Sequence, residues 1–156
     1  NASAFYPTPV GTTTAAMWDE LFASNARAPF FLAQAAAPHL QVRGGAIVNL
    51  VDIYAERPLA QHTVYSMAKS ALMMMTLSLA RELGPGVRVN GVAPGAVMWP
   101  EVGKSPAEQQ AVLASTALQR SGRPEDVAEA VRWLLMDAHY TTGQILRVDG
   151  GRALAI

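Results

Sequence analysis

The chain has 156 residues, a length that suits one domain or a large part of one. Twelve basic and twelve acidic residues cancel, so the charge gives no argument for nucleic-acid binding. Cysteine is absent, which excludes disulfides and thiolate metal sites. No apolar run approaches the roughly 18 residues that a membrane span needs. With 51% hydrophobic and 15% charged residues, the composition predicts a cytoplasmic protein with a large buried core.

Apolar residues at helical spacing indicate that the first element is a long helix, which runs from near Thr14 to Leu40. Proline removes a backbone hydrogen bond from a helix, so we expect a kink at Pro29 and an end at Pro38. The next run, residues 46–51, is apolar at nearly every position. This pattern is typical of a strand that is buried on both faces of a parallel sheet.

Helices and strands continue to alternate along the chain. The remaining predicted elements are a helix over 64–83, a strand over 87–93, a helix over 106–116, a helix that opens at 123–126 and a strand over 145–148. This alternation predicts an α/β fold with a parallel sheet and crossover helices. Ligands of such sheets bind beyond the carboxyl ends of the strands, where we expect Asp52, Pro94 and Gly95 to meet the opening loop.

Two side chains at the start of the second long helix suggest proton chemistry. Tyr65 and Lys69 are four residues apart and therefore lie on one face of the helix. A nearby ammonium lowers the pKa of a phenol, so the pair predicts a proton donor that works near neutral pH. The alternative is a partly buried tyrosine beside a surface lysine. Asp52, thirteen residues before Tyr65, favours the catalytic interpretation, as does Asn25, whose alternative is a capping or packing amide.

These motifs, in this order and spacing, resemble the short-chain dehydrogenase/reductase superfamily over essentially the whole chain. They are Asn1-Ala2-Ser3, Asn25, Tyr65 with Lys69, Asn90-Gly91-Val92-Ala93-Pro94-Gly95, Arg123-Pro124-Glu125-Asp126, and Thr142-Gly143-Gln144 with Asp149-Gly150-Gly151. The resemblance implies a Rossmann-type doubly wound parallel sheet in three α/β/α layers, of which residues 1–156 form the C-terminal portion of a single domain. It also implies self-association as a homodimer or homotetramer.

Two departures from the family pattern narrow the resemblance. Asp52 stands where the family normally has serine, and Ser3 stands where it normally has glycine. The aspartate, together with the opening stretch over residues 1–9, is similar to the pteridine reductase branch, in which a pterin is implied to stack between an aromatic ring at the Phe5 position and the nicotinamide of NADPH. The alternative for Phe5 is that it packs under its own loop.

The resemblance implies an NADPH-dependent reductase of a pterin or dihydropterin of the biopterin, folate or monapterin type, with hydride transfer to a C=N carbon. Tyr65 is implied to donate the proton, Lys69 to bind the nicotinamide ribose and lower the pKa of Tyr65, and Asn25 to hold a water that connects Lys69 to solvent. Asp52 is implied to contact the ring nitrogens and amino group of the pterin.

The implied binding residues fall into two sets. The cofactor is expected to contact Asn1, Ala2, Ser3, Val51, Tyr65, Lys69, Pro94, Gly95 and Val97. The substrate is expected to contact Phe5, Asp52, Tyr65, Met98 and Trp99, with residues 96–104 closing over it. The three histidines are scattered without ligand spacing, so we expect no metal site.

A glycine-rich phosphate-binding turn is not found in these 156 residues. We therefore expect that roughly ninety residues, equivalent to two βαβ units, precede Asn1 in the biological protein, and that one sheet edge is uncovered without them. The residue that distinguishes NADPH from NADH is expected in that part, so NADH stays open. Two rival functions also stay open: reduction of a ketone or 3-oxoacyl thioester by another member of the superfamily, and a non-catalytic binding scaffold of the same fold.

Overall fold

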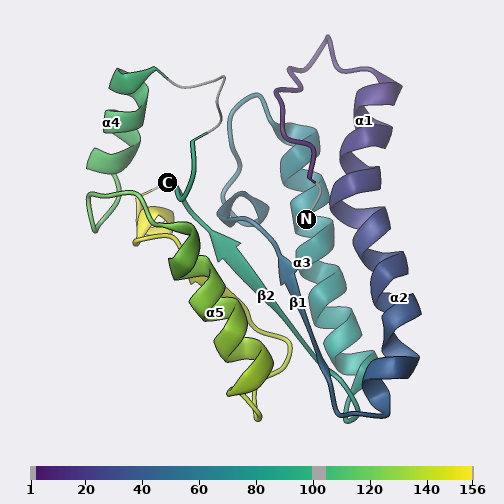
Figure 1. Ribbon diagram of the computed structural model, residues 1–156. Coiled ribbons are helices and arrows are strands. Elements are labelled where there is room, and N and C mark those ends of the chain that lie inside the picture. Colours follow the sequence, from purple (N-terminus) through teal and green to yellow (C-terminus); the bar gives the residue numbers. More distant parts are fainter. Residues whose placement is uncertain (1–2, 100–104, 156) are drawn as a thin grey trace.

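The computed structural model describes residues 3–99 and 105–155, and the statements below concern these residues. Its centre is a parallel sheet of β1 (Ala46–Leu50), β2 (Arg88–Pro94) and β3 (Ile145–Val148), in the order β1-β2-β3. Ala46 pairs with Arg88, and Gly91 with Ile145. Because all three strands run in the same direction, their carboxyl ends meet at one edge of the sheet. Figure 1 shows β1 and β2 side by side in this sheet.

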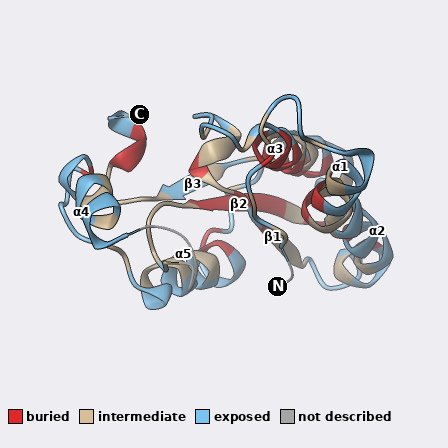
Figure 2. Cartoon of the chain, turned by 90° about the horizontal axis from the view of Figure 1, so that it is seen from above, coloured by how far each residue is buried: buried red, intermediate tan, exposed pale blue. Residues whose placement is uncertain are grey.

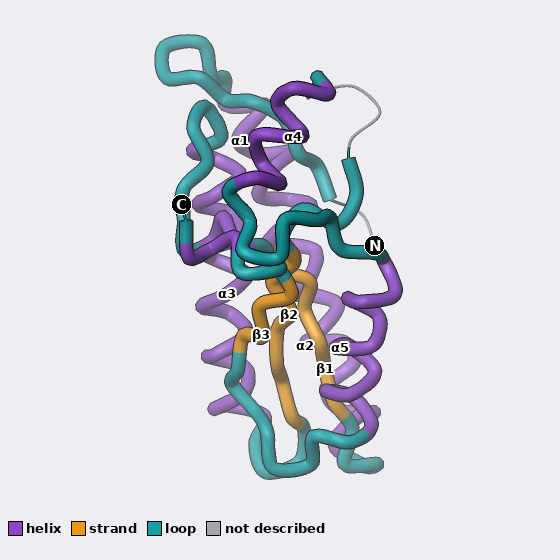
Figure 3. The backbone as a smooth tube through the Cα atoms, turned by 90° about the vertical axis from the view of Figure 1, so that its left-hand side faces the viewer, coloured by secondary structure: helices purple, strands orange, loops and turns teal. Residues whose placement is uncertain are grey.

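Helices cover both faces of this sheet. They are α1 (Ala15–Phe22), α2 (Ala28–Gln41), α3 (Thr63–Leu83), α4 (Pro106–Ala114) and α5 (Pro124–Met136), with a π-helical segment η1 (Ala23–Arg27) and two short 3-10 turns, η2 (Ile53–Ala55) and η3 (Arg152–Leu154). Figure 3 shows the strands with α3 on one side and α5 on the other. The predicted α/β architecture with crossover helices is confirmed.

The core is built on the alternation of side chains along β2. Val89 and Ala93 face one side of the sheet, where they pack into clusters that include Leu79 and Leu72 of α3. Val92 faces the other side and packs against Leu134 of α5. Successive residues of a strand point to opposite faces, so a central strand that is covered by helices on both sides is apolar throughout. Figure 2 shows the resulting concentration of buried residues on β2 and α3.

The first long helix is interrupted next to Pro29 but does not end at Pro38. It is interrupted by η1 immediately before α2, because Pro29 has no N–H to donate to the carbonyl of Asn25 one turn earlier. The expected end at Pro38 is wrong: α2 continues through Pro38 to Gln41. Ala33 and Ala37 are buried, and their packing holds the helix together across the one hydrogen bond that proline removes.

Strand β1 is less buried than predicted. Among its residues only Asn49 is buried, and Leu50 is 41% exposed. The expectation of burial on both faces is therefore wrong for β1, because the strand lies at an edge of the described sheet rather than in its middle. An uncovered edge of this kind was expected from the sequence.

Candidate active site

The site forms where the carboxyl end of β1 meets the amino end of α3. Asp52 follows β1 and caps η2, since its Oδ1 accepts a hydrogen bond of 2.9 Å from the backbone N–H of Tyr54. Tyr65 lies in the first turn of α3 and donates its phenolic O–H to Oδ2 of Asp52 at 2.7 Å. The structure thus brings together an acid and a phenol that are thirteen residues apart in the sequence.

The electrostatics of this pair differ from the expectation for Tyr65. Burial raises the pKa of the Tyr65 phenol, and the adjacent Asp52 carboxylate raises it further. Burial also raises the pKa of Asp52, partly offset by the hydrogen bonds from Tyr54 and Tyr65. The expectation of a lowered pKa for Tyr65 is therefore wrong for the ligand-free protein, because burial and the adjacent carboxylate both raise it.

Lys69 lies on the same face of α3 as Tyr65, as its spacing predicts. Its Nζ donates to the carbonyl oxygen of Leu50 at 2.9 Å and lies 5.8 Å from the centroid of the Tyr65 ring. Burial lowers the pKa of its ammonium, and the charge of Asp52 acts in the opposite direction. Among the described residues, the contact to Leu50 occupies one of its three N–H groups, so the ammonium retains donors for a ligand.

Phe5 reaches this site from the opening loop. Its ring meets Tyr65 edge-on, with centroids 4.7 Å apart and planes at 77°. It also stacks on His62, with centroids 4.8 Å apart and planes at 19°. Phe5 therefore packs against the start of α3 and not under its own loop, and it remains 44% exposed.

Thr8 fixes the opening loop to α3. Its backbone N–H donates to the carbonyl of Gln61 at 2.6 Å, and its Oγ1 accepts from the backbone N–H of Val64 at 3.3 Å. The residue before α3, His62, makes no side-chain cap, so Thr8 supplies a cap from a distant part of the chain. Sequence reasoning missed both Thr8 and His62, since no local pattern relates residues that are more than fifty positions apart.

Asn25 is buried in η1 and links the helix to the opening loop. Its Nδ2 donates to the carbonyl oxygens of Ala4 and Leu21, both at 3.0 Å. Its Oδ1 accepts from the hydroxyl of Ser3 at 2.6 Å. The packing role that the sequence left open for Asn25 is thus present, and a water held between Asn25 and Lys69 stays a prediction.

A cavity of about 510 Å³ lies beside β1 and is lined by Ser3, Asn25, Leu50 and Lys69 together with apolar side chains of α2. Among the other predicted cofactor residues, Val51 is buried and donates to the carbonyl of Val92 at 2.8 Å.

The loop after β2 holds the remaining predicted ligand residues. Gly95 passes so close to the end of β3 that a Cβ there would lie 2.7 Å from the Cα of Asp149. Pro94 ends β2, Val97 and Met98 lie in the bend that follows, and Met98 is 73% exposed; Trp99 comes directly after the bend. Asn1 and Ala2, and the part of the predicted closing segment at 100–104, lie outside the described residues.

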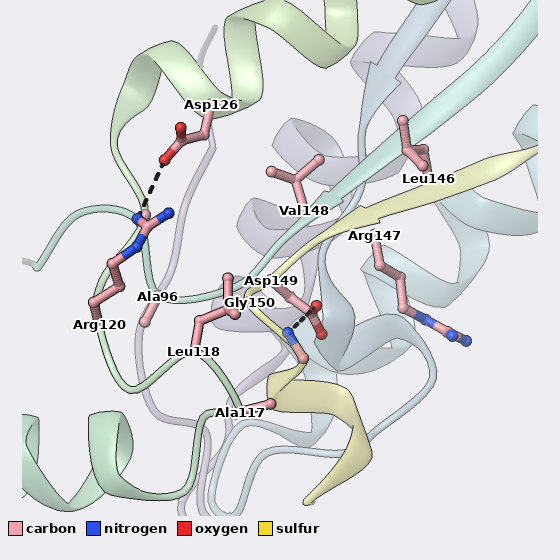
Figure 4. Close-up of a pocket in the computed structure, with 12 residues that line it drawn as sticks. Ala96, Ala117, Leu118, Arg120, Asp126, Leu146, Arg147, Val148, Asp149 and Gly150 are labelled. Carbon is pink, nitrogen blue, oxygen red and sulfur yellow. Dashed lines mark hydrogen bonds and ion pairs between the residues drawn. The ribbon is translucent and has the colours of Figure 1, made fainter.

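A second cavity, of about 480 Å³, lies at the carboxyl end of β3 (Figure 4). Arg120 and Asp126 form an ion pair of 3.8 Å at this cavity. Asp149 also lines it, but both of its carboxylate oxygens accept from backbone N–H groups, those of Gly151 and Ala153. Phe5, Asp52 and Tyr65 do not line this cavity.

Within residues 3–99 and 105–155, no three acidic, histidine or cysteine side chains gather in a way that could hold a metal ion. In the same part of the chain, no helix is both long and apolar enough to span a membrane.

The chain is similar in sequence to known reductases. A family model described as enoyl-(acyl carrier protein) reductase matches residues 1–153. Pteridine reductase 1 of Leishmania tarentolae is 37% identical in an alignment 177 positions long, gaps included, that covers 99% of this chain and 61% of that protein. The 3-oxoacyl-[acyl-carrier-protein] reductase FabG of Thermotoga maritima is 34% identical over 138 residues, which cover 86% of this chain and 56% of that protein.

Solved structures give the same result for the fold. The crystal structure of acetoin dehydrogenase YohF from Salmonella typhimurium superposes with a TM-score of 0.86 at 34% sequence identity, over 99% of this chain and 63% of that chain. The chain thus spans about three fifths of the length of the relatives it matches. The match over residues 1–153 and the Rossmann-like parallel sheet together show that the chain belongs to the short-chain dehydrogenase/reductase family.

Proposed function

We propose that the protein is an NADPH-dependent reductase of a pterin or dihydropterin, with Tyr65 as the proton donor and Asp52 as the group that selects the substrate. The observation that carries the proposal is the 2.7 Å hydrogen bond between Tyr65 and the carboxylate of Asp52. The family relationship supports an oxidoreductase of this class. The choice of NADPH over NADH, the oligomeric state as homodimer or homotetramer, and a location in the cytoplasm belong to the same proposal.

The chemistry of Asp52 favours a nitrogen heterocycle. A serine hydroxyl at this position suits a carbonyl oxygen, which only accepts hydrogen bonds. A pterin presents ring nitrogens that accept and an amino group that donates. A carboxyl group meets both needs, since it accepts when ionised and donates when protonated. Burial raises the pKa of Asp52, so the protonated form persists to higher pH than for an exposed aspartate.

Tyr65 and Asp52 can act as one proton-transfer unit. With its pKa raised, Tyr65 keeps its proton and is a poor acid on its own. When Asp52 is protonated, the carboxylate that holds the phenol is neutralised and a proton can move along the 2.7 Å contact. Tyr65 then transfers its proton to the substrate nitrogen, and protonated Asp52 returns a proton to the Tyr65 oxygen.

The residues present fit a nicotinamide cofactor at the carboxyl edge of the sheet. The Lys69 ammonium, held at 2.9 Å from the Leu50 carbonyl, has N–H groups for ribose hydroxyls. When bound, the nicotinamide supplies the hydride. Ser3, Val51, Pro94, Gly95 and Val97 are proposed to line the same site. The ammonium would also draw the equilibrium of Tyr65 toward ionisation, opposite to the effect of Asp52.

Phe5 supplies a stacking surface for a flat ring. Its ring is 44% exposed and lies 4.7 Å from Tyr65, so a substrate on its open face would lie beside the phenol. An aromatic residue in this place favours a planar bicyclic substrate over a flexible chain. Met98 and Trp99 are proposed to contact the same substrate from the loop after β2.

The rival function is reduction of a ketone or 3-oxoacyl thioester. It is favoured by the similarity to a 3-oxoacyl reductase at nearly the same identity as the pteridine reductase. Tyr65 and Lys69 would serve either reaction, so they do not separate the two. Asp52 and Phe5 do, because a carbonyl substrate needs neither a carboxyl partner nor a stacking ring. A non-catalytic scaffold would need none of these residues.

The test is the rate of NADPH oxidation with dihydrobiopterin in Tyr65→Phe. General acid catalysis typically contributes about 10²- to 10⁴-fold, so we expect kcat to fall by that factor. Tyr140→Phe is the matched control, because Tyr140 is fully exposed and its substitution leaves kcat unchanged. An unchanged kcat in Tyr65→Phe would show that the catalytic proposal is wrong.

A further inference from the structure

The histidine behind Phe5 has no role in the proton chemistry described above. The two rings are nearly parallel, at 19°, with centroids 4.8 Å apart. An aromatic ring has two faces, and His62 covers one of them, while Tyr65 meets the ring edge-on. The Phe5 side chain as a whole is 44% exposed. Because His62 covers one face, a flat ligand that stacks on Phe5 would have to use the other.

The imidazole of His62 is itself held in place. Its Nδ1 lies 2.8 Å from the carbonyl oxygen of Ala60. A carbonyl oxygen only accepts, so Nδ1 carries a hydrogen and donates it, which fixes the orientation of the ring.

The turn that carries His62 is also fixed. Gln61 has a positive φ of 60°, an uncommon conformation for a residue other than glycine. The carbonyl of Gln61 accepts from Thr8 at 2.6 Å, which joins this turn to the loop of Phe5. Both rings of the stack are therefore anchored through one connection.

We propose that His62 is a positioning residue that holds Phe5 ready for a flat ring and thereby favours pterins over open-chain ketones; this rests on the proposed function. Without His62, Phe5 keeps only its edge contact with Tyr65, so its ring is less ordered and binding a flat ring must first order it. The ordering cost affects substrates that stack on Phe5. It does not affect a 3-oxoacyl thioester, which has no ring to place there.

The experiment compares His62→Ala with His62→Phe in the full protein with NADPH. Stacking of aromatic rings predicts a KM for dihydrobiopterin that rises about two- to twelve-fold in His62→Ala. Since the proton chemistry is untouched, kcat changes by less than about twofold. His62→Phe restores a ring at this position and keeps KM near the wild-type value. KM for acetoacetyl-coenzyme A is unchanged in both variants.

A double-mutant cycle separates positioning from direct contact. In a Phe5→Leu background, His62→Ala is expected to add no further increase in KM, because His62 acts through Phe5. A full additional increase would overturn the proposal. Equal losses with dihydrobiopterin and acetoacetyl-coenzyme A, or no rescue by His62→Phe, would also overturn it, since either result indicates a general structural role.

A measurement without substrate distinguishes failure of this inference from failure of the proposed function. The NMR shifts of the His62 ring protons in the ligand-free protein are expected to move when Phe5→Leu removes the neighbouring ring current. Shifts that do not move would overturn the proposed stack. If the shifts move but the wild-type protein reduces no dihydropterin, the proposed function fails, and the preference for pterins that we attribute to His62 fails with it.

Discussion

Two aspartates, Asp52 and Asp149, occupy similar places in the sheet but have different partners. Each follows the carboxyl end of a parallel strand, and each uses Oδ1 to accept the backbone N–H two residues later, at 2.9 Å in both cases. The second oxygen distinguishes them. In Asp149 it accepts from the backbone of Ala153 at 2.8 Å, whereas in Asp52 it accepts from the Tyr65 phenol at 2.7 Å.

This difference separates a structural acid from a candidate chemical one. The carboxylate of Asp149 is fully used by the turn that follows it, so it stabilises that turn and has no oxygen directed at a titrating side chain. Asp52 stabilises its turn with one oxygen and holds a proton donor with the other. An aspartate at a strand end is therefore a poor indicator of function by itself. The partner of its second carboxylate oxygen distinguishes a structural role from a chemical one.

The largest expected effect comes from matched amide substitutions at the two positions. Asp52→Asn cannot return a proton to Tyr65, so we expect kcat with dihydrobiopterin to fall by about 10²-fold or more. Asp149→Asn loses one acceptor for a backbone N–H and costs roughly 0.5–2 kcal/mol of unfolding free energy, with kcat changed little. Steady-state kinetics and urea unfolding of both variants measure this. Equal loss of kcat in both would remove the distinction.

The pH dependence of stability is a second way to test the special environment of Asp52. The pKa of Asp52 in the folded protein is raised above its ordinary value of 3.8, so the folded state binds this proton more tightly than the unfolded state. Its contribution to stability is present below pH 3.8 and is lost as pH rises through the raised pKa.

Urea unfolding across this range measures the contribution of Asp52. As pH rises, the unfolding free energy of wild type should fall relative to that of Asp52→Asn. A raised pKa would be contradicted if the relative stability of the two proteins stayed constant over the range, or if wild type gained stability relative to the variant.

The smallest expected effect concerns an ion pair between β3 and the turn that follows β1. Arg147 of β3 pairs with Glu56, which follows η2, and both side chains are partly exposed, at 49% and 31%. Exposed ion pairs typically contribute about 0–1 kcal/mol, so Glu56→Gln should lower the unfolding free energy by no more than that. A double-mutant cycle with Arg147→Met isolates the pair. A coupling well above this range would mean that the two strand ends are joined more tightly than their exposure suggests.

Most of the fold could be predicted from periodicity because its signals are local. Helical spacing and apolar runs located the three strands and the main helices. The misses depend on context. The exposure of Leu50 depends on which strands flank β1, and the passage of α2 through Pro38 depends on the packing of the alanines beside it.

In the candidate site, too, local features could be predicted and features that depend on tertiary contacts could not. The shared face of Tyr65 and Lys69 follows from four-residue spacing, and the structure places both there. The direction of the pKa shift of Tyr65 could not be predicted, because it depends on burial and on the contact with Asp52. The cap from Thr8 and the stack of His62 on Phe5 join segments more than fifty residues apart, so local spacing in the sequence does not predict them.

The central claim is that Asp52 selects a pterin over a ketone, and Asp52→Ser tests it most directly. The measurement is the ratio of kcat/KM for dihydrobiopterin to kcat/KM for acetoacetyl-coenzyme A, in wild type and variant. We expect the ratio to fall by about 10²-fold or more, because a serine hydroxyl can orient a carbonyl but cannot replace the proton-transferring carboxyl. A ratio that stays the same or rises would contradict the assignment of Asp52 to substrate selection.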